Sequence, residues 1–156
     1  MLSIGVDIGG TKVAAGVVDE DGEILRHLVR PTPSRSPEAV ENAIVEVVDS
    51  LSDGLPVKSA GIGAAGWVDT EQALVRFSPH LAWRNEPLRD RLSERIDLPV
   101  IVDNDANAAA WAEYEFGAGR DSRVMTCITL GTGIGGALGI NGRGFRGRHG
   151  MGGGFG

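Results

Sequence analysis

The stretch LSIGVDIGGTKVAAGVV, residues 2–18, has two apolar segments joined by a glycine turn, which is typical of a β-hairpin. A similar stretch, VMTCITLGTGIGGALGI, begins 122 residues later and covers residues 124–140. Glycine and apolar positions coincide without gaps, as in the pairs Gly9/Gly131, Ala15/Ala137 and Val6/Ile128. Glycine enrichment explains part of this match. Still, a repeated strand–turn–strand unit predicts two similar lobes, one over residues 1–121 and the start of a second over residues 122–156.

Between the two glycine turns, strand and helix patterns alternate. Apolar residues at helical spacing predict a helix over residues 36–51, with Ser36 as its N-cap and Pro37 in its first turn. A short helix is expected over 87–96, and an alanine-rich helix over 107–117 that ends at Gly117. Strands are expected at residues 2–8, 11–30 (two strands with a turn at 21–22), 57–66, 98–105, 122–131 and 134–142, with a small hairpin at 67–77 and a loop at 78–87. This order predicts an α/β fold whose sheet has mixed strand directions.

The composition is that of a soluble globular protein, with 42% hydrophobic and 23% charged residues. The 15 Lys and Arg and 21 Asp and Glu give a net charge of −6, which disfavours a nucleic-acid partner. No segment approaches the ~18 apolar residues of a membrane span, and the N-terminus lacks the pattern of a secretion signal. The single cysteine, Cys127, lies in an apolar run and is expected in the core. We therefore expect a cytoplasmic protein without a membrane partner.

The turn DIGGTK, residues 7–12, is the first candidate binding site. Gly9 and Gly10 allow backbone N–H groups to approach a phosphate closely. Thr11 adds a hydroxyl and Lys12 a positive charge, and the Asp7 carboxylate can hold Mg²⁺, usually through water. The stretch matches neither the Walker pattern nor the dinucleotide fingerprint, and it leads into a strand rather than a helix. Taken alone, it fits a plain hairpin with a glycine turn equally well.

The second glycine turn, residues 131–136, is a candidate of the same kind. Gly131, Thr132 and Gly133 again combine permissive backbone with a hydroxyl. Two such turns, one in each repeat, would hold a single polyphosphate if they faced each other across a cleft. The pair is therefore a more specific signal than either turn alone.

The polar cluster DNDAN, residues 103–107, lies between a predicted strand and a predicted helix. Helix capping explains one or two of these residues, because Asp and Asn are favoured there and the helix dipole stabilises a carboxylate. Capping does not require four polar side chains in five positions. A carboxylate held at such a point can accept the proton of a hydroxyl nucleophile during phosphoryl transfer. We assign this role to Asp105.

Other side chains give weaker signals. The three histidines, His27, His80 and His149, do not have the spacing of metal ligands. Trp83 lies in the polar stretch SPHLAWRN, where it either packs in the interior or presents an aromatic face to a sugar.

Four motifs in this order resemble those of the ROK family of sugar kinases and related repressors: VDIGGTK, GIGAAGWVD, VDNDANAAAWAE and LGTGIGGALG. The stretch FSPHLAWRNEPL also resembles the family's substrate loop. Within the family, the chain is most similar to bacterial ATP-dependent glucokinases of the actinobacterial type. The resemblance implies the actin-like, ribonuclease-H-like ATPase fold, here as a complete N-terminal lobe with the first hairpin of the second lobe.

The resemblance also implies a reaction and roles for individual residues. Asp105 matches the catalytic base that takes the proton from the sugar 6-hydroxyl. Asn104, His80 and the backbone of Gly66 match substrate-binding positions. Both glycine turns match phosphate motifs that bind ATP, and Asp7 matches the carboxylate near Mg²⁺. The implied reaction is transfer of the γ-phosphate of ATP to the 6-hydroxyl of glucose.

The last residues depart from the family pattern. Gly154 stands where the family has a sugar-binding Glu, and the family's neighbouring His would follow the last residue. The family's cysteine-rich zinc motif is absent, so a structural zinc is expected only in a full-length relative, as is a homo-oligomer. Two alternatives therefore stay open: a non-catalytic truncated fragment of such a kinase, or a kinase for fructose, mannose or an N-acetyl-hexosamine. The family's repressors carry a DNA-binding segment before the kinase-like part, and a first strand that begins at residue 2 favours a kinase.

The second hairpin is expected to lack a partner for its apolar side chains. Positions such as Val124, Ile128 and Leu138 would then be exposed next to an unpaired strand edge. The sequence therefore predicts poor solubility or self-association.

Overall fold

The computed structural model describes residues 1–33, 36–131 and 133–154. Its largest element is a five-stranded sheet built from β1 (Leu2–Ile8), β2 (Lys12–Val18), β3 (Ile24–Pro31), β4 (Val57–Ala64) and β8 (Val100–Asn104). The strand order is β3-β2-β1-β4-β8. β1, β2 and β3 form an antiparallel meander, whereas β1, β4 and β8 run parallel to one another. The expectation of an α/β fold with mixed strand directions is confirmed.

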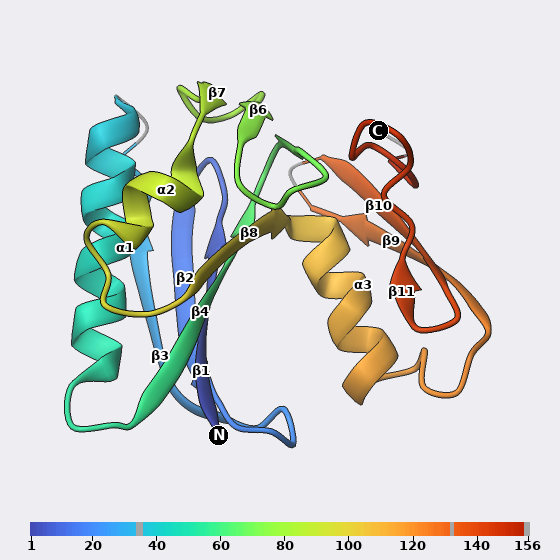
Figure 1. The fold of residues 1–156 in the computed structure, drawn as a ribbon, viewed down its shortest axis with the longest axis horizontal. Helices are drawn as coiled ribbons and strands as arrows, with labels where there is room; N and C mark the ends of the chain where they lie inside the picture. Colours follow the sequence, from blue (N-terminus) through green and yellow to red (C-terminus); the bar gives the residue numbers. More distant parts are fainter. Residues whose placement is uncertain (34–35, 132, 155–156) are drawn as a thin grey trace.

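Two helices, α1 (Pro37–Ser52) and α2 (Leu88–Ser93), lie on one side of this sheet (Figure 1). Alternate residues of β1 and β2 point to that side, and Ile4, Val6 and Ile8 are at most 2% exposed. Together with the apolar stripe of α1 they form the main hydrophobic core. Ser36 caps α1 as predicted, because its hydroxyl accepts a hydrogen bond of 3.1 Å from the backbone N–H of Ala39.

A small antiparallel sheet follows β4 and consists of β5 (Trp67–Val68), β6 (Val75–Phe77) and β7 (Arg84–Glu86). The sequence predicted the hairpin of β5 and β6, but β7 falls within residues 78–87, which were expected to be a loop. Trp83 is completely buried in the core just before β7. Its ring therefore packs in the interior and is not available to a sugar.

A second three-stranded sheet, in the order β11-β10-β9, is separate from the first two. It contains β9 (Val124–Leu130), β10 (Ile134–Ile140) and β11 (Arg143–Gly144). A tight two-residue turn joins β10 and β11, since Asn141 and Gly142 have φ values of 49° and 76°, as such a hairpin turn requires. Helix α3 (Asp105–Phe116) lies between this sheet and the five-stranded sheet and contacts both (Figure 1).

The two repeated hairpins differ in register by one residue. In the first, Ile8 pairs with Val13, whereas in the second Leu130 pairs with Ile134, so the second turn is one residue shorter. A shift of one residue moves side chains to the other face of a strand. As a result, Ala137 pairs with Cys127 on the face toward α3, whereas its counterpart Ala15 pairs with Val6. Residues that match in the sequence repeat therefore do not have matching partners across the two hairpins.

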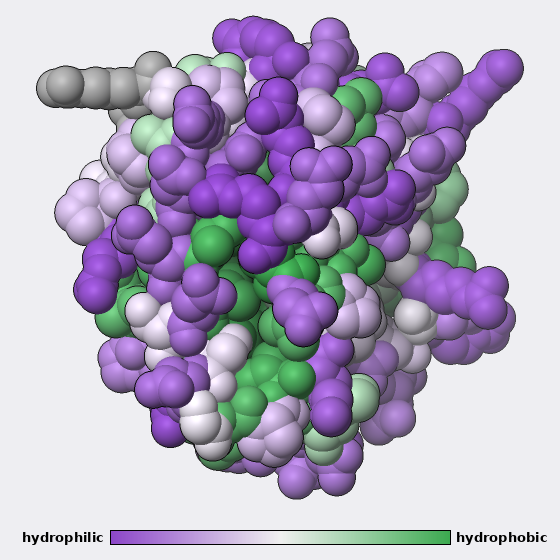
Figure 2. All heavy atoms as spheres, turned by 60° about the vertical axis from the view of Figure 1, so that its left-hand side comes forward, coloured by the Kyte–Doolittle hydropathy of each residue, from purple (hydrophilic) through white to green (hydrophobic). Residues whose placement is uncertain are grey.

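The face that carries α1 is mostly polar, with apolar atoms visible between the charged side chains (Figure 2). Cys127 is only partly buried, so the expectation of a core cysteine is not fully met. Among the described residues, no helix combines the length and the apolar character needed to cross a membrane.

Candidate active site

Several of the predicted site residues lie at one edge of the five-stranded sheet. β1, β4 and β8 are parallel, so their carboxyl ends meet at this edge, where ligands bind in many open α/β sheets. Asp7 is the penultimate residue of β1, and Asn104 is the last residue of β8. Asp105, which follows Asn104, is the first residue of α3. The fold therefore brings together residues that are almost 100 positions apart in the chain.

Asp7, which is exposed, and Asp105, which is partly buried, form a pair of neighbouring carboxyl groups. Burial raises the pKa of Asp105 above its ordinary value. The hydrogen bonds that its carboxylate accepts from backbone N–H groups lower the pKa and partly offset this increase. One of these is the N–H of Ala106, at 2.9 Å from Oδ1. Burial also raises the pKa of Asp7, and the charge of Asp105 raises it further, whereas Lys12 lowers it. Gly63 of β4 pairs with Asp7, and a Cβ on Gly63 would lie 3.7 Å from the Cα of Asp105, so the two acidic residues lie close together.

The first glycine turn is held tightly and packs against His80. The N–H of Gly9 donates to the carbonyl of Lys12 at 3.0 Å, and the Thr32 hydroxyl donates to the carbonyl of Gly9 at 2.8 Å. A Cβ on Gly10 would lie 2.6 Å from the Cβ of His80, so only glycine fits at this position. The predicted phosphate turn and the predicted substrate-binding histidine are therefore direct neighbours.

Gly66 and Asn104 are joined by a hydrogen bond. The Asn104 Nδ2 donates to the carbonyl of Gly66 at 2.8 Å, and the Oδ1 accepts from the backbone N–H of Asn107 at 3.1 Å. Nearby, the fully buried Ser78 donates from its hydroxyl to the carbonyl of Ala65 at 2.6 Å. No local sequence pattern indicates this role for Ser78, because the acceptor, Ala65, lies 13 residues earlier in the chain.

The second glycine turn follows β9, and Gly131 and Gly133 are exposed. The N–H of Gly131 donates to the carbonyl of Gly133 at 2.9 Å. Thr132 lies outside the described residues. Two residues into β10, a Cβ on Gly135 would lie 3.1 Å from the Cβ of Ala106 in the first turn of α3. The start of β10 is therefore next to Asp105, but no direct contact joins Gly131 or Gly133 to the first glycine turn.

Asp103 and Arg146 form a contact that the sequence did not predict. Both Nη atoms of Arg146 donate to the Asp103 carboxylate, at 2.7 and 2.5 Å. The hydrogen bond to Asp103 raises the pKa of Arg146, so the guanidinium stays charged. Asp103 belongs to the polar cluster seen in the sequence, but Arg146 follows 43 residues later among glycines, and no local pattern connects the two.

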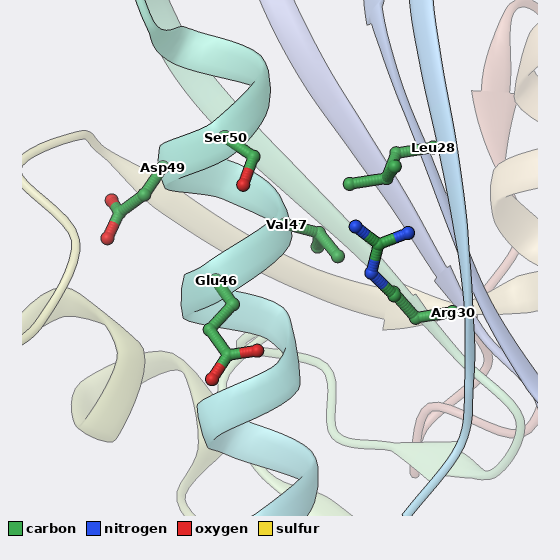
Figure 3. A pocket seen from close by; sticks show the side chains of 6 residues that line it. All are labelled: Leu28, Arg30, Glu46, Val47, Asp49 and Ser50. Carbon is green, nitrogen blue, oxygen red and sulfur yellow. The ribbon is translucent and has the colours of Figure 1, made fainter.

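A shallow groove of about 310 Å³ lies elsewhere on the surface, between β3 and α1 (Figure 3). Leu28 and Val47 form its apolar part, the Arg30 guanidinium lies beside them, and Asp49 points away from Arg30 (Figure 3). None of the predicted site residues lines this groove. The carboxyl edge of the sheet, rather than the groove, is therefore the candidate active site.

Among the described residues, no cluster of three or more His, Cys, Asp or Glu side chains has the arrangement of a metal site. The pair of Asp7 and Asp105 remains as a source of carboxylate oxygens, which are the ligands that Mg²⁺ prefers. This pair fits a hydrated divalent cation better than a dehydrated one, because it supplies few protein ligands.

The mixed five-stranded sheet with helices packed on it is the actin-like ATPase fold of the ROK sugar kinases. The closely similar solved structures have this fold. A ROK family glucokinase from Streptomyces griseus, crystallised with glucose and AMPPNP, superposes with a TM-score of 0.96 at 52% identity, covering 100% of this chain and 50% of that one.

The chain belongs to the ROK family, whose model matches residues 3–156. It is 51% identical to the glucokinase of Streptomyces coelicolor over 96% of its length, and 38% identical to the N-acetylmannosamine kinase of Escherichia fergusonii over 88%. The chain spans about half the length of these relatives, since it covers 47% of each.

Proposed function

We propose that this chain is the sugar-binding and phosphate-binding part of a glucokinase-type hexose kinase, which transfers the γ-phosphate of ATP to the 6-hydroxyl of glucose. The observation that supports this best is the position of Asp105, half-buried at the carboxyl edge of the sheet and close to Asp7. The 51% identity to a glucokinase supports the same reaction. Because the chain covers 47% of that relative, the activity of the whole protein is part of the proposal.

Asp105 acts as the base in this proposal. As the 6-oxygen of the sugar attacks the γ-phosphorus, the Asp105 carboxylate accepts the hydroxyl proton. The new P–O bond forms while the bond to the β-phosphate oxygen breaks, and ADP leaves. The raised pKa of Asp105 suits this role, because a base accepts a proton better when its pKa is nearer the working pH.

Asn104, Gly66 and His80 bind the sugar in this proposal. The Asn104 amide has two N–H donors and two acceptor positions, and its bonds to Gly66 and Asn107 use one of each. One donor and one acceptor therefore remain for a sugar hydroxyl on a side chain that is already fixed. His80 packs against Gly10 of the first glycine turn, and this position beside the predicted phosphate turn supports its proposed contact with the sugar.

The two glycine turns bind the phosphates of ATP in this proposal. Gly9, Gly10, Thr11 and Lys12 provide the first turn, and Gly131, Thr132 and Gly133 the second. Asp7 would hold a hydrated Mg²⁺, which would supply positive charge to offset that of the phosphates. A cation beside Asp7 would also offset the repulsion between Asp7 and Asp105, which raises the pKa of Asp7. No zinc site is proposed for this chain.

We further propose that residues 1–121 form one lobe and residues 122–156 begin a second. The separation of the β9–β11 sheet from the five-stranded sheet supports this division. The proposal places the protein in the cytoplasm, with sugar and ATP as ligands and without a nucleic-acid or membrane partner. A homo-oligomer is expected for full-length relatives.

A second candidate function is hexose binding without phosphoryl transfer. It is favoured by Gly154, which has no side chain to replace the sugar-binding carboxylate that the resemblance predicts there. The identity of the hexose is also part of the proposal, because an N-acetylmannosamine kinase shares 38% identity with the chain.

The test is ADP formation by the purified chain with glucose, mannose, fructose or N-acetylmannosamine in turn. We expect glucose-dependent ADP formation that falls by about 10²–10⁴-fold in Asp105→Ala, the usual contribution of a general base. Asp49→Ala, at an exposed carboxylate on α1, is the control and should retain activity. Glucose binding in the absence of ADP formation would support the second candidate. Neither binding nor turnover with any of the sugars would refute both.

A further inference from the structure

Asp103 lies where the three sheets meet, and its carboxylate accepts five hydrogen bonds. Oδ1 accepts from the backbone N–H of Asn104 at 2.8 Å and from Nδ2 of Asn107 at 3.2 Å. Oδ2 accepts from Nε2 of Gln72 at 3.1 Å. Arg146 donates to both oxygens. One carboxylate therefore joins β8, the first turn of α3, the turn between β5 and β6, and the segment after β11.

Arg146 begins a segment, residues 146–154, that packs closely on its surroundings. A Cβ on Gly150 would lie 2.4 Å from the carbonyl oxygen of Val68 in β5, and one on Gly153 would lie 2.7 Å from the backbone nitrogen of Leu138 in β10. Both glycines have positive φ, so their backbone conformation excludes most other residues. The segment thus bridges the sheet of β5 and the sheet of β10, and Arg146 is its charged attachment to β8.

The ion pair of Asp103 and Arg146 is less exposed than a surface ion pair and has two hydrogen bonds. The Asp103 and Arg146 side chains are 15% and 27% exposed, and the guanidinium binds the carboxylate with two parallel hydrogen bonds. Such bidentate pairs fix geometry as well as charge, and lysine cannot reproduce them. The neighbouring bonds from Asn104 and Asn107 then connect this fixed carboxylate to the residues that flank Asp105.

We propose that Asp103 and Arg146 are a positioning pair that holds the start of α3, and with it Asn104 and Asp105, in the arrangement that receives the hexose. The inference rests on the proposed function for its consequence in sugar binding. Neither residue is a catalytic residue in this account, since both act through Asn104 and Asn107.

The first test needs no sugar. Amide exchange is measured at Ala106 and Asn107, whose N–H groups bond to Asp105 and Asn104, and at Val47 in the core as a reference. Arg146→Met should speed exchange at Ala106 and Asn107 by about tenfold, the usual scale for loss of a charged hydrogen bond, and leave Val47 unchanged. Arg148→Met is the matched control, because Arg148 makes no ion pair in the part of the chain that the structure describes.

The second test measures glucose and AMPPNP dissociation constants by calorimetry. Arg146→Met should weaken glucose binding by about tenfold and change nucleotide binding by less than about twofold. Arg146→Lys should fall between wild type and Arg146→Met, because it keeps the charge but loses the paired hydrogen bonds.

Two results would overturn the inference: exchange at Ala106 and Asn107 that matches the Arg148→Met control, or exchange that rises equally at all three amides. The second result would reveal a general loss of stability. If the wild-type chain binds no glucose, the proposed function fails for this chain, and the exchange at Ala106 and Asn107 still decides the inference.

Discussion

At the residue scale, the half-buried carboxyl of Asp105 combines a proposed role in catalysis with a cost in stability. Its pKa is raised in the folded protein, mainly by burial. The folded state therefore keeps the Asp105 proton to a higher pH than the unfolded state does. Folding stability from this group is present at low pH and is lost as the pH rises through the folded pKa. The repulsion that Asp105 exerts on Asp7 has the same sign.

The first prediction follows from this sign. Asp105→Asn removes the buried charge and keeps an oxygen that can accept the hydrogen bond from Ala106. Near neutral pH we expect the free energy of unfolding to rise by about 0.5–2 kcal/mol, as is common when an unfavourable functional residue is replaced. The gain should shrink as the pH falls toward about 4, because the raised pKa lets the folded wild-type protein take up the Asp105 proton before the unfolded chain does.

Urea unfolding followed by circular dichroism between pH 4 and 8 measures this difference. Asp49→Asn, at an exposed carboxylate on α1, is the control and should change stability by less than about 0.5 kcal/mol. A less stable Asp105→Asn at neutral pH would show that the charged form of Asp105 contributes to stability.

The sequence predicts those residues of the candidate site that stand in a local pattern, and it misses those that only the tertiary fold brings there. Asp105 and Asn104 stand out because several polar residues follow an apolar strand, a pattern that capping alone does not explain. Arg146 has no such pattern around it. Its partner, Asp103, is 43 residues away and is brought to it only by the packing of residues 146–154 on β5 and β10. Predicted roles for single residues remain predictions, including those of His80 and Gly66.

At the element scale, α1 shows what apolar spacing predicts and what it omits. The predicted helix and its Ser36 cap are confirmed, and Ile44, Val47, Val48 and Leu51 are buried as expected. The buried side also includes Glu41, at 3% exposed, which no apolar pattern can indicate. Its burial depends on α2 and β7, which bring Arg91, Arg95 and Glu86 to it.

The second prediction concerns this cluster. The pKa of Glu41 is raised from its ordinary value of 4.5, first by burial and then by the neighbouring Glu86 carboxyl, while the two arginines act against the increase. Glu41 therefore lowers the stability of the fold as the pH rises above about 4.5. Glu41→Gln removes this dependence and keeps the size and shape of the side chain. At pH 7 we expect an increase in the free energy of unfolding of about 1 kcal/mol relative to wild type, and little change at pH 4.

Thermal and denaturant unfolding at several pH values tests the prediction. Glu46→Gln is the matched control, because Glu46 is an exposed carboxylate on the same helix. If Glu41→Gln is less stable than wild type at every pH, attraction to Arg91 and Arg95 outweighs the cost of burial. The prediction would then be wrong.

At the scale of the whole molecule, the repeated hairpins have different surroundings. In the first hairpin, Val6 and Ile8 are at most 2% exposed, because α1 packs on their side of the sheet. The matching residues of the second hairpin, Ile128 and Leu130, are 59% and 81% exposed. The sequence repeat therefore predicts the hairpin, because glycine and apolar order are local properties. It predicts neither the register nor the burial, which depend on turn length and on what packs against the strands.

The last prediction concerns the apolar face of the second sheet, defined by Val124, Ile128, Leu130, Ile134 and Ile140. These side chains lie on one face of β9 and β10, and β9 is at the edge of its sheet. An exposed apolar face beside an unpaired edge favours association between copies of the chain. We expect the average mass in sedimentation and light-scattering experiments to increase with protein concentration.

Ile128→Lys places a charge at the centre of this face and should weaken association by about tenfold or more, since burial of one isoleucine is worth about 1.5–3 kcal/mol. Ile101→Lys, at a 55% exposed isoleucine on β8, is the control and should associate like wild type. A wild-type chain that stays monomeric at all concentrations would contradict the prediction, and equal weakening by both variants would assign the association to a different face.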